Sequence, residues 1–116
     1  MAMPMPVLPD FARRDWTVEE VRALPDEGRR YEVIDGELLV TPTPSWLHQR
    51  AVGELLMLLH PYTYLHDLDL LMARAEVTFS PRRSVEPDVF VVPTLDGRRA
   101  TCFEEVKRLM LVVEVT

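Results

Sequence analysis

At 116 residues, the chain is long enough to bury one hydrophobic core and too short for two ordinary domains. Hydrophobic residues make up 47% and charged residues 28%, as in an average globular domain, which excludes a disordered chain, and no apolar run approaches the length of a membrane span. The formal net charge of −6 argues against nucleic-acid binding through a broad basic surface, because phosphate neutralisation requires Lys and Arg.

The chain is predicted to begin with a flexible arm over residues 1–15, followed by one domain over residues 16–116. The first ten residues are rich in Met and Pro, and they lack the basic leader and the apolar segment of a secretory signal. The single cysteine, Cys102, cannot form an internal disulfide, and no catalytic partner for it is visible. These features predict a protein of the reducing cytoplasm that does not associate with membranes.

The basic residues are concentrated in five adjacent pairs, which contain ten of the thirteen: Arg13 and Arg14, Arg29 and Arg30, Arg82 and Arg83, Arg98 and Arg99, Lys107 and Arg108. Several pairs fall in predicted turns, where guanidinium groups could reach phosphates. The alternative is an ordinary solvated surface, and the sequence alone favours that second interpretation.

The first predicted elements are a short helix and a β-hairpin. Thr17 and Glu20 form a capping-box pattern that opens a helix ending at Leu24. Residues 31–41 carry a hairpin signal at Asp35-Gly36. With a two-residue turn there, Ile34 faces Glu37, Val33 faces Leu38 and Tyr31 faces Val40. One face of the hairpin is then apolar, and the other places Glu32 and Glu37 beside Ile34 and Leu39.

A longer helix and three strands are predicted after the hairpin. Thr43 or Ser45 can cap a helix that runs to about Leu59 and covers a sheet with its apolar side, leaving His48 on or near the other side. Residues 60–72 show no clean period. Strands are predicted over residues 75–79, 85–92 and 109–115, with Pro87 near the start of the second and a helical turn over residues 103–108.

Glu114 is unusual because it is the one polar residue in the segment 109–115. The other residues of this segment are apolar, which predicts a strand covered on both faces. A carboxylate in that position costs several kcal/mol unless it is paired, protonated or bound to a metal ion. Three explanations stand at this point: a metal site, a buried ion pair with Arg50 or Arg74, or a strand end that has emerged into solvent.

Asp88 strengthens the first explanation. It follows Pro87 at the mouth of another apolar strand, so it lies at an edge of the same predicted sheet. Two acids on adjoining strands can clamp Mg²⁺, which prefers carboxylate oxygens, waters and substrate phosphate, and which activates water in phosphodiester hydrolysis. Alone, an aspartate after proline is more often a cap at the start of a strand.

Four motifs in order carry a family resemblance: Tyr31-Glu32-Val33-Ile34-Asp35-Gly36-Glu37-Leu38, His48-Gln49, Glu86-Pro87-Asp88-Val89 and Leu111-Val112-Val113-Glu114-Val115. From about Trp16 to the last residue, the sequence resembles the Uma-two-like restriction endonuclease family of the PD-(D/E)XK superfamily. The resemblance implies an α+β fold, with a restriction-endonuclease-like core of a helix followed by a mixed β-sheet, and an N-terminal β-hairpin ahead of it.

The resemblance also implies a site and a reaction. Asp88 matches the aspartate of the PD pair and Glu114 the acid of the (D/E)XK element, and both would bind a metal ion, Mg²⁺ or Mn²⁺. Glu37 matches a further acid near the cleft, with Glu32 as a substitute, and His48 would assist phosphate binding at a helix start. The implied activity is that of a metal-dependent DNA endonuclease that contacts DNA only locally.

The sequence departs from the family pattern at its end, because the family continues beyond the Glu114 position with a helix that bears the site lysine. Lys107, the only lysine, precedes Glu114 and does not match that position. A lysine there offsets developing negative charge, so weak or no activity is expected without it. The C-terminal part of the fold is expected to be missing, which leaves a sheet edge open to homo-oligomers. The alternatives are therefore an inactive remnant that acts as an interaction module, and a fragment of a longer reading frame.

Overall fold

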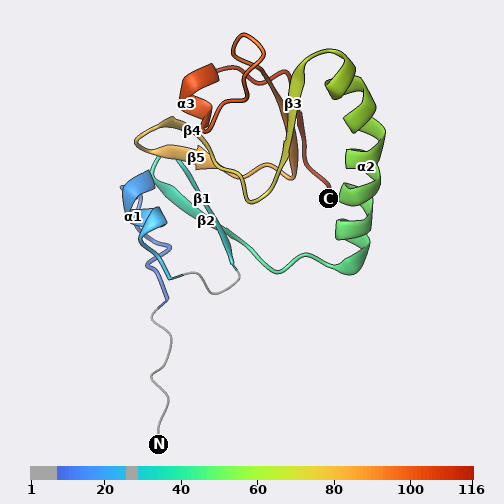
Figure 1. Ribbon diagram of the computed structural model, residues 1–116. Helices are drawn as coiled ribbons and strands as arrows, with labels where there is room; N and C mark the ends of the chain where they lie inside the picture. Colours follow the sequence, from blue (N-terminus) through green and yellow to red (C-terminus); the bar gives the residue numbers. More distant parts are fainter. Residues whose placement is uncertain (1–7, 26–28) are drawn as a thin grey trace, which may run out of the picture.

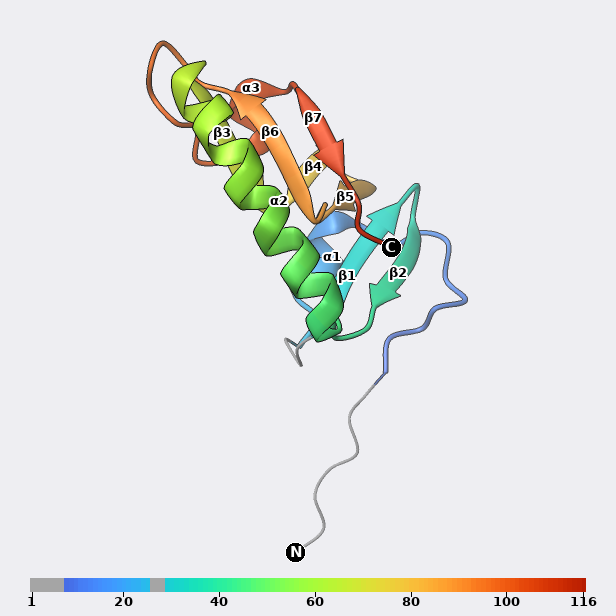
Figure 2. The same ribbon diagram turned by 90° about the vertical axis from the view of Figure 1, so that its right-hand side faces the viewer.

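A computed structural model describes residues 8–25 and 29–116 of the chain. Its elements follow the order α1 (Val18–Arg22), β1 (Arg30–Ile34), β2 (Glu37–Thr41), α2 (Trp46–Leu65), β3 (Leu68–Met72), β4 (Val77–Ser80), β5 (Arg83–Val85), β6 (Val89–Pro93), α3 (Phe103–Val106) and β7 (Leu111–Val113). The strands form two sheets, ordered β2-β1-β5-β4 and β3-β6-β7, and α2 lies along the second sheet (Figure 1, Figure 2). The predicted α+β class is confirmed, and all pairings between described strands are antiparallel where the resemblance implied a mixed sheet.

The hairpin has the predicted register, with Ile34 opposite Glu37 and Val33 opposite Leu38. Its turn requires a left-handed backbone at Asp35 (φ 52) and Gly36 (φ 85), which Asp and Gly adopt more readily than other residues. The apolar face packs under α1, whose capping box between Thr17 and Glu20 is formed as predicted. The first core cluster contains Trp16, Val18, Val33 and Leu38.

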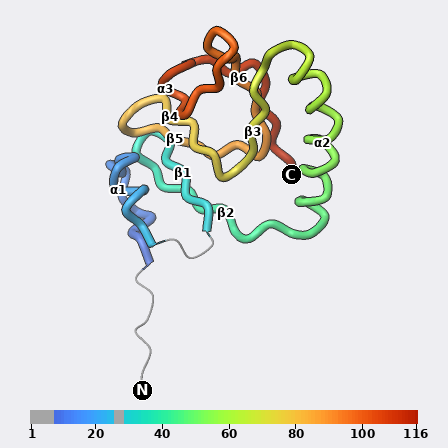
Figure 3. The backbone as a smooth tube through the Cα atoms, viewed as in Figure 1, coloured from blue at the N-terminus to red at the C-terminus, as the bar shows by residue number. Residues whose placement is uncertain are grey.

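Helix α2 begins as predicted and ends later than predicted. The Ser45 hydroxyl accepts a hydrogen bond from the His48 amide, which caps the helix at the end of the connector from β2 (Figure 3). The helix continues through Pro61 to Leu65 and occupies most of the segment that had no clean period. Within the helix Thr63 is buried, and its hydroxyl donates to the His60 carbonyl.

The strand predicted over residues 85–92 is wrong in one respect, because it consists of two strands in different sheets. β5 ends at Val85 and pairs in the first sheet, whereas β6 starts at Val89 in the second. Pro87 between them has no N–H to donate to a ladder, and the Glu86 amide donates to the Glu32 carboxylate instead. Asp88 therefore lies where the chain crosses from one sheet to the other.

The predicted strand over residues 109–115 is shorter than expected and is not covered on both faces. β7 spans Leu111–Val113 at the edge of its sheet, and Leu111 and Val112 are exposed. Only β6 pairs with it among the described residues. Glu114 follows the strand and is exposed, so the prediction of a strand covered on both faces is wrong at this end.

The second core cluster lies between β4, β6 and α3, and it contains Val77, Phe90, Val92 and Phe103. None of the helices in the described residues combines the length and the apolar character of a membrane span.

Residues 1–7 of the expected N-terminal arm lie outside the described residues. In the rest of the arm, the Asp10 carbonyl accepts a hydrogen bond from the Trp16 indole, and the Arg13 guanidinium lies over the Trp16 ring. The flexible arm stays a prediction.

Candidate functional site

Asp88 and Glu114 lie opposite each other across two neighbouring strands. β6 and β7 pair Val89 with Val113, and the next position in that register places Asp88 beside Glu114. Both acids line a cleft of about 810 Å³ together with Arg30 of β1 and His48 of α2. The cleft therefore joins the first sheet, the second sheet and the start of the long helix, and it contains both acids that the sequence predicted.

The Asp88 side chain is buried, with 3% of its surface exposed, and both of its oxygens accept hydrogen bonds. Arg30 Nη1 donates to Oδ1 at 2.9 Å, the Val115 amide donates to Oδ2 at 2.8 Å, and His48 Nε2 lies 3.2 Å from Oδ2. Burial by itself raises the pKa of Asp88, but the bonds from Val115, Arg30 and His48 outweigh it and hold the pKa below its usual value. Asp88 is therefore ionised at neutral pH.

Glu114 has the opposite electrostatics. Partial desolvation in the cleft and then the negative charge of Asp88 raise the pKa of Glu114 above its usual value. Arg30 opposes this shift. Burial and the neighbouring Asp88 charge therefore both disfavour the ionised form of Glu114, and a cation bound beside the two acids would favour it.

The donor set fits a hard divalent cation. Mg²⁺ is commonly held by one or two carboxylates plus waters and substrate phosphates, and Asp88 and Glu114 supply such a pair. Over residues 8–25 and 29–116, no group of three or more His, Cys, Asp or Glu side chains is arranged to hold a metal ion.

The structure does not bring Glu37 into this cleft. Glu37 is exposed beside the hairpin turn and pairs with Ile34, four residues along β1 from Arg30, which is roughly 13 Å at the rise of a strand. Glu32 lies closer: it is half-buried on the same face of β1 as Arg30, and its charge contributes to the raised pKa of Glu114. The alternation of side chains along β1 was the available signal for Glu32.

His48 points to Asp88 rather than away from the sheet. Besides its contact with Asp88, its Nδ1 lies 3.2 Å from the Gln49 side-chain oxygen. A protonated imidazole can donate to both oxygens at once. The predicted role of His48 in phosphate binding stays a prediction.

Sequence reasoning gave Arg30 no specific place at this site, and it named Arg74 only as an alternative ion-pair partner of Glu114. Arg30 contacts Asp88, a contact between residues 58 positions apart in the chain that no local pattern predicts. Arg74 lines the cleft, and its Nη2 donates to the Arg29 carbonyl. The only lysine, Lys107, ends α3 in a left-handed conformation and does not line the cleft.

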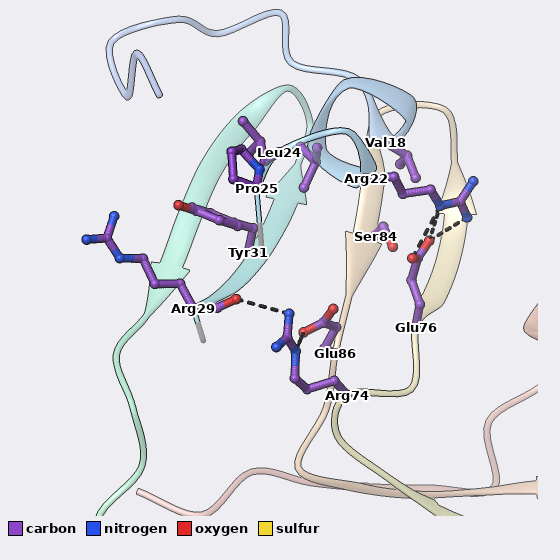
Figure 4. A pocket seen from close by; sticks show the side chains of 11 residues that line it. Val18, Arg22, Leu24, Pro25, Arg29, Tyr31, Arg74, Glu76, Ser84 and Glu86 are labelled. Atoms are coloured by element: carbon purple, nitrogen blue, oxygen red, sulfur yellow. Dashed lines mark hydrogen bonds and ion pairs between the residues drawn. The ribbon is translucent and has the colours of Figure 1, made fainter. Parts of the chain in front are cut away.

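A second, smaller cavity of about 250 Å³ shares Arg74 with the cleft (Figure 4). Figure 4 shows Arg74 between the Arg29 carbonyl and the Glu86 carboxylate. Glu86 Oε2 is buried without a hydrogen-bond partner, 3.9 Å from Arg74 Nε. Burial raises the pKa of Glu86 to about 7, against the opposing charge of Arg74. Residues 84–88 thus place two acids with opposite pKa shifts in neighbouring cavities.

Comparison with known proteins assigns the chain to a family. Residues 18–116 match the family model described as "Uma2: Putative restriction endonuclease". No curated protein matches the chain significantly. The match spans the hairpin, α2, the junction at Asp88 and the acid at Glu114, so the chain belongs to the Uma2 restriction endonuclease family.

Proposed function

We propose that this protein is a metal-dependent DNA endonuclease, whose metal ion, Mg²⁺ or Mn²⁺, is held by Asp88 and Glu114. The observation that carries the proposal is the position of these two acids, opposite each other at the ends of β6 and β7 in one cleft. Membership of a restriction endonuclease family supports phosphodiester hydrolysis as the reaction.

Other residues at the cleft would supply positive charge, hydrogen bonds and further negative charge around the proposed metal ion. A divalent ion bound at such a pair activates water and stabilises the leaving oxygen. Arg30 and His48 supply the positive and hydrogen-bonding side chains next to the acids, since Lys107 lies elsewhere. Glu32 adds negative charge that favours a cation over a neutral ligand.

DNA is the substrate that the family supports, and the net charge of −6 restricts its contacts to the surroundings of the cleft. Arg30 and Arg74 line the cleft and can bind phosphate oxygens. We also place the protein in the cytoplasm, where a DNA substrate and a free thiol at Cys102 are compatible.

A second candidate function, that of an interaction module, is supported by one observation. Apolar side chains on α2 and β7 are exposed, among them Leu58 at 77%, Leu65 at 78% and Val112 at 44%. Exposed apolar surface of this kind and an unpaired strand edge favour association with another chain, including a homo-oligomer.

Nicking of supercoiled plasmid DNA distinguishes the two candidates. The endonuclease proposal predicts nicking with millimolar Mg²⁺ or Mn²⁺ and no nicking in EDTA. Asp88→Asn should reduce the rate by at least about 100-fold, because it removes the negative charge of one of the two proposed metal ligands. Glu37→Gln is the control and should leave the rate unchanged, because Glu37 lies outside the cleft.

The outcome that would contradict the endonuclease is equally definite. Purified protein that nicks no DNA with either metal ion, and whose Asp88→Asn variant has the same melting temperature response to metal as the wild type, leaves the interaction module as the better account. Metal-dependent nicking by a protein that elutes as a clean monomer eliminates the module.

A further inference from the structure

Arg30 occupies an unusual position, because its positively charged guanidinium lies against the acids that are proposed to bind the metal ion. Its Nη1 lies 2.9 Å from Asp88 Oδ1, and the side chains of the pair are 16% and 3% exposed. Glu32 and Glu114 add further negative charge around the same guanidinium. Arg30 thus supplies one positive charge to three carboxylates.

Asp88 has little capacity left for another ligand while this pair is formed. An ionised carboxylate offers about four lone-pair positions. Arg30 uses one on Oδ1, and His48 and the Val115 amide use those on Oδ2. One position remains, and it lies on the oxygen that Arg30 contacts.

The Arg30 pair also has fewer hydrogen bonds than two more exposed ion pairs elsewhere in the fold. Arg22 contacts Glu76 through two nitrogens, Nε and Nη2, and Arg83 Nη2 contacts both oxygens of Asp35 at 2.8 and 2.7 Å. Arg30 contacts Asp88 through a single donor, and its Nε is buried without a hydrogen-bond partner. A buried unpaired N–H is unfavourable, which lowers the cost of moving the guanidinium away from Asp88.

We propose that Arg30 is a built-in counterion of the site, which holds the Asp88 carboxylate in the absence of a metal ion and competes with a divalent cation for it. The proposal rests on the proposed function of the cleft as a metal site, and it assigns to Arg30 the control of metal affinity. A guanidinium displaced from Asp88 stays in the cleft, where it can bind a phosphate oxygen.

The direction in which Arg30→Gln changes the affinity for Mn²⁺ tests the proposal. We expect Arg30→Gln to bind Mn²⁺ about tenfold more tightly than the wild type in calorimetric titration, because one positive charge a few ångströms from the ion is removed. If Arg30 merely orients Asp88, the same variant binds Mn²⁺ more weakly. Arg30→Lys keeps the charge and should stay within about threefold of the wild type. Arg83→Gln is the matched control, since it breaks an exposed pair outside the cleft, and its affinity should be unchanged.

A measurement on the wild type covers the case in which Arg30→Gln does not fold. In ¹⁵N spectra of the arginine Nε–H groups, the Arg30 signal should move during a Mg²⁺ titration with the same dissociation constant as the metal, and the Arg83 signal should stay in place. An Arg30 signal that does not respond while the protein binds metal overturns the proposal.

The results separate this inference from the proposed function. Wild-type protein that binds Mn²⁺, with an Arg30→Gln variant that binds it no more tightly, contradicts the counterion and leaves the metal site intact. Absence of binding in both contradicts both. Binding by Arg30→Gln alone supports the counterion in its strongest form.

Discussion

Glu86 shows how the junction between the sheets makes stability depend on pH. Its pKa is raised by burial to about 7 in the folded protein, against an ordinary value of 4.5. A group whose pKa is raised on folding stabilises the fold when protonated, so this contribution is complete below pH 4.5 and is lost as pH rises through about 7.

We therefore expect Glu86→Gln to relieve a loss of stability at higher pH. The difference in unfolding free energy between Glu86→Gln and the wild type should shift in favour of the variant by on the order of 2 kcal/mol between pH 5 and pH 8. Urea denaturation in EDTA at both pH values measures this shift. A difference that is the same at both pH values would show that Glu86 is not protonated in the fold.

Glu32 and Glu37 provide a second test at the level of single residues. Glu32 contributes negative charge at Glu114, whereas Glu37 lies beyond the cleft at the hairpin turn. We expect Glu32→Gln to weaken Mn²⁺ binding by roughly three- to tenfold through lost Coulomb attraction, and Glu37→Gln to change it by less than about twofold. The reverse order of effects would restore the assignment that the family motif suggests for Glu37.

The acids of the site could be predicted from sequence and their partners could not. Asp88 and Glu114 stand out because each is a charge beside an apolar run. Arg30 and Glu86 acquire their roles from contacts across two sheets, and such contacts depend on where the chain crosses between the sheets. The strand before Glu114 was wrongly predicted to be covered on both faces for a similar reason. A short apolar run has the same sequence pattern in a central strand and in an edge strand such as β7.

Among the elements, the hairpin turn and α2 offer a matched pair of glycines. A Cβ at Gly36 would lie 2.1 Å from the Arg14 carbonyl oxygen, and the backbone there is left-handed. A Cβ at Gly53, inside α2, would meet no atom within 4 Å.

Alanine at these two positions should have opposite effects. Gly36→Ala should destabilise the protein by about 2 kcal/mol or more, through clash and backbone strain. Gly53→Ala should stabilise it by about 0.5–1 kcal/mol, because alanine has the higher helix propensity. Thermal or urea denaturation measures both, and equal destabilisation by the two variants would contradict the arrangement around the hairpin turn.

Local signals predicted the elements well where the element is stabilised locally. The hairpin register and the capping box of α1 depend on neighbouring residues and are confirmed. Two boundaries were wrong because tertiary contacts decide them. Packing against β3 carries α2 past Pro61, and the crossing at Pro87 divides one apolar run into β5 and β6.

At the scale of the whole molecule, α2 exposes several large apolar side chains. Leu47, Leu58, Tyr64 and Leu65 are each more than 70% exposed. An apolar groove of about 720 Å³ lies between α2 and β3 and adds to this surface. Apolar surface of this extent favours association.

We expect the protein to associate with increasing concentration, which sedimentation velocity or size-exclusion chromatography with light scattering detects. Leu58→Glu should suppress this association without lowering the melting temperature, because Leu58 is 77% exposed. Leu8→Glu, at an exposed leucine outside α2, is the control and should associate like the wild type. A protein that is monomeric at all concentrations would show that α2 is not used in this way.

The metal site at the junction of the two sheets is the central claim, and paramagnetic broadening by Mn²⁺ tests it most directly. In ¹H–¹⁵N spectra of the protein with a small amount of Mn²⁺, the amides of Val89 and Val115 should broaden most, because they flank or contact Asp88. Broadening should fall along β6 towards Val92 and Leu95, and it should vanish in Asp88→Asn. Spectra that do not change with Mn²⁺, or broadening centred away from Asp88 and Glu114, would contradict the account.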